Sequence, residues 1–104
     1  MAEAALVFAA LGDPTRLALV RRLCAGGPAS ISVLAESFHV SRQAITKHLQ
    51  VLAVSGIIDG TRSGRQHVWQ LNPDRIADAR CCLETIARAW DDALGRLKAR
   101  LEQR

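Results

Sequence analysis

The chain has 104 residues, of which 49% are hydrophobic and 23% charged, and its net charge is +4. This length and composition predict one domain with one core and exclude an intrinsically disordered chain. No apolar run reaches the ~18 residues needed to cross a bilayer, and the start lacks the basic segment of a secretory signal. The three cysteines follow no regular spacing, so we expect a cytoplasmic protein with no membrane partner.

Two short helices are predicted before the first strong break in the chain. The first covers residues 3–11, and the second covers residues 15–24. Asp13 is a favourable N-cap for the second helix, and Pro14 fits its first position, where no backbone N–H is needed. Gly26 opens the Gly-Gly-Pro run that ends it. We expect the second helix to bury Leu17, Val20, Leu23 and Cys24.

Two further helices are predicted on either side of a short turn at residues 39–41. The first covers residues 31–38 and is capped by Ser30 or Ser32, and the second runs from Ser41 to about residue 55. The second helix separates into two faces at helical spacing. Its apolar stripe contains Ala44, Ile45, Leu49 and Leu52, and its polar face contains Arg42, Gln43, Thr46, Lys47 and Gln50.

The polar face of this second helix contains no acidic residue. Asp and Glu would repel phosphates, whereas Arg, Lys, Gln and Thr contact phosphates and base edges. Two short helices joined by a tight turn, the second polar and basic outside, are typical of a DNA-binding helix-turn-helix. The alternative is an ordinary amphipathic helix with a solvated charged face.

A β-hairpin is predicted at residues 57–71, because the hydrophobic period changes from helical to alternating. Its polar turn covers residues 61–65, and Trp69 and Leu71 share the face that should pack onto the helices. After a helix-turn-helix, a basic hairpin tip is typical of a wing that lies along DNA, although arginines at such a tip can simply be solvated. The tip carries Arg62, Arg65 and Gln66.

The last helix is predicted to run from Pro73 to about residue 102, with Asn72 as its N-cap. A continuous apolar seam follows it at spacings of three and four. A helix this long extends beyond what so small a domain can cover, so we expect the seam to pack against a second copy of the chain. The alternative for its tryptophan is ordinary core. The seam contains Leu83, Ile86, Trp90, Leu94, Leu97 and Leu101.

Three runs in this order and spacing make the chain resemble the ArsR family of winged-helix repressors over nearly its whole length. They are Leu11-Gly12-Asp13-Pro14-Thr15-Arg16, then Leu34-Ala35-(x5)-Ser41-(x2)-Ala44-Ile45-(x2)-His48-Leu49-(x2)-Leu52, and Arg62-(x)-Gly64-Arg65-(x3)-Trp69-(x)-Leu71.

The resemblance implies a mostly α-helical winged helix-turn-helix with a β-hairpin wing. Its five helices would form a homodimer through the first helix, with Leu6, and the last. The helix-turn-helix would occupy residues 30–55, the wing residues 57–71 and the dimerisation helix residues 73–102. It also implies repression by occlusion of a promoter, with two recognition helices in successive major grooves of a near-palindromic operator.

Metal-sensing relatives carry two cysteines in the helix before the recognition helix, where this chain has Ser30 and Ser32. A serine hydroxyl is a poor ligand for soft metals. A second family site uses His on the last helix, but no His follows His67. We therefore expect no metal site and no cofactor, and the sequence identifies no small-molecule or ion effector.

The cysteines Cys24, Cys81 and Cys82 leave two alternatives open. In the first, Cys24 and one of the adjacent pair are small buried apolar residues. In the second, an exposed Cys81 or Cys82 senses arsenite, another soft ion or oxidation, which would make the chain a thiol-responsive repressor.

The sequence therefore favours a sequence-specific DNA-binding regulator that binds double-stranded DNA as a homodimer. A protein-interaction adaptor is the rival hypothesis, and no pattern of an enzyme active site is present. The expected base-reading residues are Gln43 and Thr46, with Arg42 sharing that task or contacting phosphate. The expected backbone contacts are Ser41, Lys47, His48, Arg62 and Arg65, with Gln66 beside them at the tip of the hairpin. The alternative for His48 is local packing.

Overall fold

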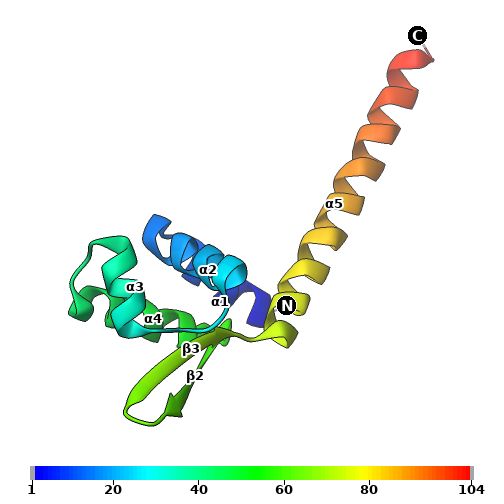
Figure 1. The fold of residues 1–104 in the computed structure, drawn as a ribbon. Coiled ribbons are helices and arrows are strands. Elements are labelled where there is room, and N and C mark those ends of the chain that lie inside the picture. Colours follow the sequence, from blue (N-terminus) through cyan, green and yellow to red (C-terminus); the bar gives the residue numbers. More distant parts are fainter. Residues whose placement is uncertain (1, 104) are drawn as a thin grey trace.

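The computed structural model describes residues 2–103, which form five helices and a three-stranded antiparallel sheet (Figure 1). Within these residues, no helix is both long enough and apolar enough to cross a membrane. The elements in chain order are α1 (Ala2–Leu11), α2 (Pro14–Gly26), β1 (Ala29–Ser30), α3 (Ile31–Phe38), α4 (Arg42–Ser55), β2 (Ile58–Ser63), β3 (Gln66–Leu71) and α5 (Pro73–Glu102).

Side-chain caps begin four of the helices, as the sequence predicts. Asp13 accepts a hydrogen bond from the Arg16 backbone N–H at 3.0 Å, and Asn72 caps α5 in the same way. Ser30, rather than Ser32, caps α3, and Ser41 caps α4. These oxygens satisfy N–H groups that have no partner inside the helix, so the helix boundaries are fixed locally.

The turn of the helix-turn-helix depends on one residue in the left-handed region. His39 ends α3 with φ of 54°, the only non-glycine residue with a positive φ in the part of the chain that the structure describes. At the other end of α4, Gly56 has φ of 86° and acts as the C-cap. Both residues stop a helix by reversing the backbone, which sets the short connections around α4.

The core lies where α1, α2, α3 and α4 meet the sheet. Its fully buried side chains include three of the four that the sequence places on the apolar stripe of α4, together with residues from α1, α2, α3 and β2. These side chains are Val7, Leu19, Leu34, Ile45, Leu49, Leu52 and Ile58. The fourth residue of the stripe, Ala44, is half-buried.

The predicted buried face of α2 is wrong at two of its four positions. Val20 and Leu23 are buried, but Leu17 is 43% exposed and Cys24 is also exposed. Leu19 fills the core in their place. Apolar residues cover more than half of the circumference of α2, so periodicity allows more than one inward face, and packing against α4 and β3 selects the face with Leu19.

The sheet has the order β1-β3-β2, and β1 was not predicted because it is only two residues long. The predicted turn at residues 61–65 is too long, since Thr61 to Ser63 belong to β2 and pairing continues as far as Ser63 opposite Gln66. Only Gly64 and Arg65 remain as a two-residue loop, and Gly64 has φ of 62°.

Aromatic stacking stiffens the wing. Trp69 is buried opposite Ala29 and Gly60, and the His67 ring stacks on it with 4.6 Å between the ring centroids. A Cβ on Gly60 would approach both rings within 3.0 Å, so a side chain there would displace the stack. Leu71 packs against the same core, as the sequence predicts.

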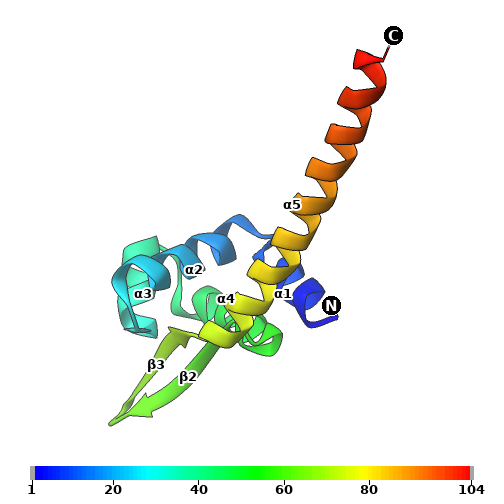
Figure 2. The same ribbon diagram turned by 90° about the vertical axis from the view of Figure 1, so that its right-hand side faces the viewer.

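Helix α5 extends far from the rest of the chain, on the side away from the wing (Figure 2). The described residues span 68 Å in their longest dimension and only 25 Å in the next. All six side chains of the predicted seam are exposed, by 46–65%. The first part of α5 contacts α1, and Ala79 is its buried residue among those described.

Candidate nucleic-acid interface

The polar face of α4 is exposed and forms one continuous surface. Arg42, Gln43 and Lys47 are exposed, Thr46 is half-buried, and the four side chains line a single shallow hollow. None of the fourteen residues of α4 is acidic. A donor-rich surface without carboxylates on a single helix has the shape and charge needed to enter a DNA major groove.

Two hydroxyls on this surface are already engaged by the backbone. Ser41 accepts from the Ala44 N–H at 3.1 Å, and Thr46 donates to the Arg42 carbonyl at 2.7 Å. These bonds hold the start of α4 in a fixed conformation. The Ser41 oxygen only accepts in its bond, so its hydroxyl proton is left for an outside contact at the positive end of the helix dipole.

His48 lies apart from the other predicted DNA-contacting residues of α4. Its Nδ1 lies 3.8 Å from Oδ2 of Asp13, and its side chain is only 26% exposed. The structure thus brings Arg42, Gln43, Thr46 and Lys47 together on one surface, leaves Ser41 exposed at the start of the helix, and places His48 against the turn between α1 and α2.

The wing carries a second basic group of exposed side chains. Arg62 lies on β2 opposite His67, Arg65 lies in the two-residue loop, and Gln66 begins β3. The wing projects from the opposite end of the molecule to α5 (Figures 1 and 2). Between Ser41 and His67 the chain has four Arg and Lys residues and one acid, Asp59, so the two groups carry a net positive charge.

Residues 11–61 match the family model described as a helix-turn-helix domain. The chain is 40% identical over 85 residues to the HTH-type transcriptional regulator Rv2034 of Mycobacterium tuberculosis, covering 82% of this chain and 76% of that protein. It is 31% identical over 85 residues to the HTH-type transcriptional repressor SmtB of the same species, covering 82% of this chain and 61% of SmtB. The structure of an ArsR-like transcriptional regulator from Rhodococcus sp. RHA1 is 37% identical, with a TM-score of 0.79 over 93% of this chain and 91% of that one.

The chain belongs to the ArsR family of winged helix-turn-helix transcriptional regulators. Membership confirms the predicted fold and the interpretation as a DNA-binding transcriptional regulator, and it favours that interpretation over the adaptor hypothesis. The family consists of transcriptional regulators rather than enzymes. The roles of individual residues stay predictions.

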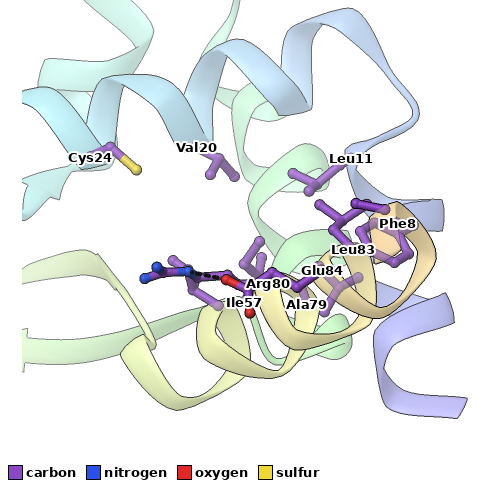
Figure 3. Close-up of a pocket in the computed structure, with 12 residues that line it drawn as sticks. Phe8, Leu11, Val20, Cys24, Ile57, Ala79, Arg80, Leu83 and Glu84 are labelled. Carbon is purple, nitrogen blue, oxygen red and sulfur yellow. Dashed lines mark hydrogen bonds and ion pairs between the residues drawn. The ribbon is translucent and has the colours of Figure 1, made fainter. Parts of the chain in front are cut away.

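The cysteines of this ArsR-family chain are more accessible than in the alternative that buries Cys24 and one of the adjacent pair. Cys24 and Cys81 are exposed and Cys82 is half-buried, so the prediction that Cys24 is a buried apolar residue is wrong. Cys24 faces an apolar groove of about 460 Å³ between α1, α2 and α5, across from Arg80 (Figure 3). Among the described residues, no three His, Cys, Asp or Glu side chains are grouped as a metal site would require.

The contact between His48 and Asp13 was missed by reading the sequence. Both residues belong to the runs that resemble the family, but they are 35 positions apart, and periodicity carries no information on which distant residues meet. A signal was present in the helical geometry of α4, because residue 48 falls about 60° from Ile45 and about 40° from Leu52, but about 140° from Gln43.

Asp13 should make the stability of the chain depend on acid pH. The backbone N–H of Arg16 donates to its carboxylate, and this bond outweighs desolvation; the positive charges of Arg16 and His48 add to it. The pKa of Asp13 therefore lies below its ordinary value of 3.8. A carboxyl of this kind stabilises the folded state above its unfolded pKa, and the contribution is lost as the pH falls through the folded pKa.

The variant Asp13→Asn isolates this effect, because it keeps a capping oxygen and removes the charge. At pH 7 we expect the wild type to have the larger free energy of unfolding. The difference should shrink as the pH falls below the ordinary pKa of 3.8 and should be lost once the pH lies below the folded pKa of Asp13. Urea unfolding over this pH range measures it, and a difference that stays constant into acid would contradict the assignment.

Proposed function

We propose that this chain is a transcriptional repressor that binds a near-palindromic operator as a homodimer and occludes the promoter. The observation that carries this proposal is the acid-free exposed face of α4, held in a fixed conformation at its start by the Ser41 cap. Family membership supports DNA binding, and the printed name of the SmtB relative supports repression.

The exposed side chains of α4 and of the wing have different roles in this proposal. Gln43 and Thr46 read base edges in the major groove, because residues in the first turns of a recognition helix lie closest to the bases. Arg42 shares that task or contacts phosphate. The remaining contacts go to the DNA backbone and set the register of the protein, through Ser41, Lys47, Arg62, Arg65 and Gln66.

The dimer is formed by α1 and α5. The seam of α5 is exposed in the single chain, and Leu6 on α1 is 56% exposed. Pairing through these surfaces removes large apolar side chains from water, a strong driving force for association. It also joins two copies of α4 at a fixed distance, which suits half-sites about 34–36 Å apart.

A fluorescence-anisotropy titration tests the proposal. The probe is the duplex DNA upstream of the gene for this protein, in moderate salt with excess competitor DNA. Saturable binding that survives the competitor supports the proposal. If the protein does not bind that duplex, it is used to select sequences from random DNA. Failure to enrich any sequence would overturn the proposal. Repeating the titration with arsenite and with a mild oxidant tests whether the exposed Cys24 and Cys81 respond to an effector.

Arg65→Ala tests the role of the wing. If each Arg65 of the dimer neutralises one phosphate, the variant should bind all sequences more weakly, without a change in preference. The slope of log affinity against log salt should become shallower by about 0.9 for each lost contact, or about 1.8 per dimer.

The matched control is Arg88→Ala, which removes the same charge from an exposed position on α5. It should leave the slope unchanged. An equal change in both variants would mean that Arg65 acts only through the net charge of the protein.

A further inference from the structure

His48 lies on the wrong side of α4 to read DNA. At 100° per residue it is about 140° around the helix from Gln43 and about 100° from Lys47. It is instead about 60° from the buried Ile45 and about 40° from the buried Leu52, and its side chain is 26% exposed. Its ring points to the turn between α1 and α2, away from the surface formed by Arg42, Gln43, Thr46 and Lys47. This position favours a role of His48 other than DNA contact.

That turn joins the ends of two helices through side chains. Oδ2 of Asp13 accepts from the Arg16 backbone N–H at 3.0 Å, and the same oxygen lies 3.8 Å from Nδ1 of His48. The Nε of Arg16 donates to the carbonyl of Ala10 at 2.6 Å, near the end of α1. The end of α1, the start of α2 and the middle of α4 therefore meet at one polar cluster.

We propose that His48 is a positioning residue, which uses its Nδ1 contact with Asp13 to fix the recognition helix α4 relative to α1. This inference rests on the proposed function, in which α1 belongs to the dimer interface and α4 binds DNA. The cluster then transmits the geometry of the dimer to the two recognition helices. Its loss should impair binding that needs both helices at the correct spacing, and leave binding by a single helix intact.

The chemistry of side-chain amides separates this role from a DNA contact. Asn places its amide nitrogen where histidine has Nδ1, whereas Gln places its amide nitrogen close to the position of Nε2. A contact with Asp13 through Nδ1 should survive in His48→Asn and be lost in His48→Gln. A contact with phosphate through Nε2 should show the reverse order.

The experiment uses the full chain and a duplex selected from random-sequence DNA by the wild type. A second duplex keeps one half-site and scrambles the other. Anisotropy titrations at pH 6 give both affinities and the salt slope. The variants are His48→Asn, His48→Gln, Asp13→Asn and the double variant Asp13→Asn/His48→Gln, each checked for its melting temperature. His39→Asn is the matched control, because His39 is exposed and Asn tolerates its left-handed backbone.

We expect His48→Gln and Asp13→Asn each to weaken operator binding about threefold to tenfold, the effect of one polar contact weakened in each protomer. The double variant should be no weaker than the weaker single variant, because both changes remove the same contact. His48→Asn and His39→Asn should bind within about twofold of the wild type. Half-site affinity and the salt slope should not change in any of them.

Three results would overturn the proposal. The first is retention of affinity by His48→Gln with loss in His48→Asn, accompanied by a shallower salt slope, which would make His48 a phosphate contact. The second is wild-type operator binding by Asp13→Asn. The third is an equal fall in half-site and operator affinity.

Failure of the proposed function would appear in the wild type itself, as equal affinity for the operator and the half-site, and would overturn both proposals.

Discussion

A Trp90→Glu/Leu94→Glu chain should be monomeric and should bind its operator about 10²–10⁴-fold more weakly than the wild type. Both side chains are exposed in the single chain, by 65% and 56%. In the dimer they would be buried against another copy, where two unpaired carboxylates per chain are strongly unfavourable. Without the partner, each recognition helix binds alone, and the gain from linking two weak sites is lost.

Sedimentation equilibrium and anisotropy on the same samples measure this prediction. The melting temperature of a dilute sample serves as a check on folding, because the seam contributes little to the core of a single chain. Ala99→Glu is the matched control, since Ala99 is exposed and lies about 180° around α5 from Trp90. It should remain dimeric and bind normally.

Two outcomes would contradict this account of α5. If the Trp90→Glu/Leu94→Glu chain is still a dimer, the interface lies elsewhere on the molecule. If it is a monomer that binds the operator as tightly as the wild type, one recognition helix suffices, and the long exposed seam has another purpose.

The sequence predicts this fold well wherever capping chemistry and hydrophobic period agree. Ser41 and Gly56 enclose α4, and Asn72 with Pro73 begins α5, within one or two residues of the prediction. In each case the cause is local: a side-chain oxygen satisfies a free N–H group, or a glycine adopts a positive φ. Such signals can be read without knowledge of what the helix packs against.

The errors arise where tertiary packing decides between local options. Leu17 and Cys24 are as apolar as Leu19, but only Leu19 faces the core. Strand β1 exists because Ala29 pairs with Trp69, forty residues along the chain, and two residues alone carry no period. The same limit applies to the site. The exposed face of α4 follows from its own spacing, whereas the contact of His48 with Asp13 requires the positions of three helices.

Gln43→Ala/Thr46→Ala should remove sequence preference while keeping general DNA binding. Gln43 is the second residue of α4 and is exposed, so its amide can make paired hydrogen bonds to the edge of an adenine. Thr46 uses its hydroxyl proton within the helix, which leaves its methyl group to contact a thymine methyl. Each good base contact is worth about 1–3 kcal/mol of discrimination, or about 5–150-fold.

Competition of the selected operator against single-base variants and against random DNA measures this loss. The ratio of operator to random affinity should fall by at least about fivefold. The salt slope should stay close to that of the wild type, because neither residue is charged. Gln70→Ala is a matched control on an exposed position of β3 and should keep the full preference. If the ratio of operator to random affinity is unchanged in Gln43→Ala/Thr46→Ala, then Arg42 or the wing reads the bases instead. A loss of operator and random binding together would instead mean that these side chains support α4 rather than read bases.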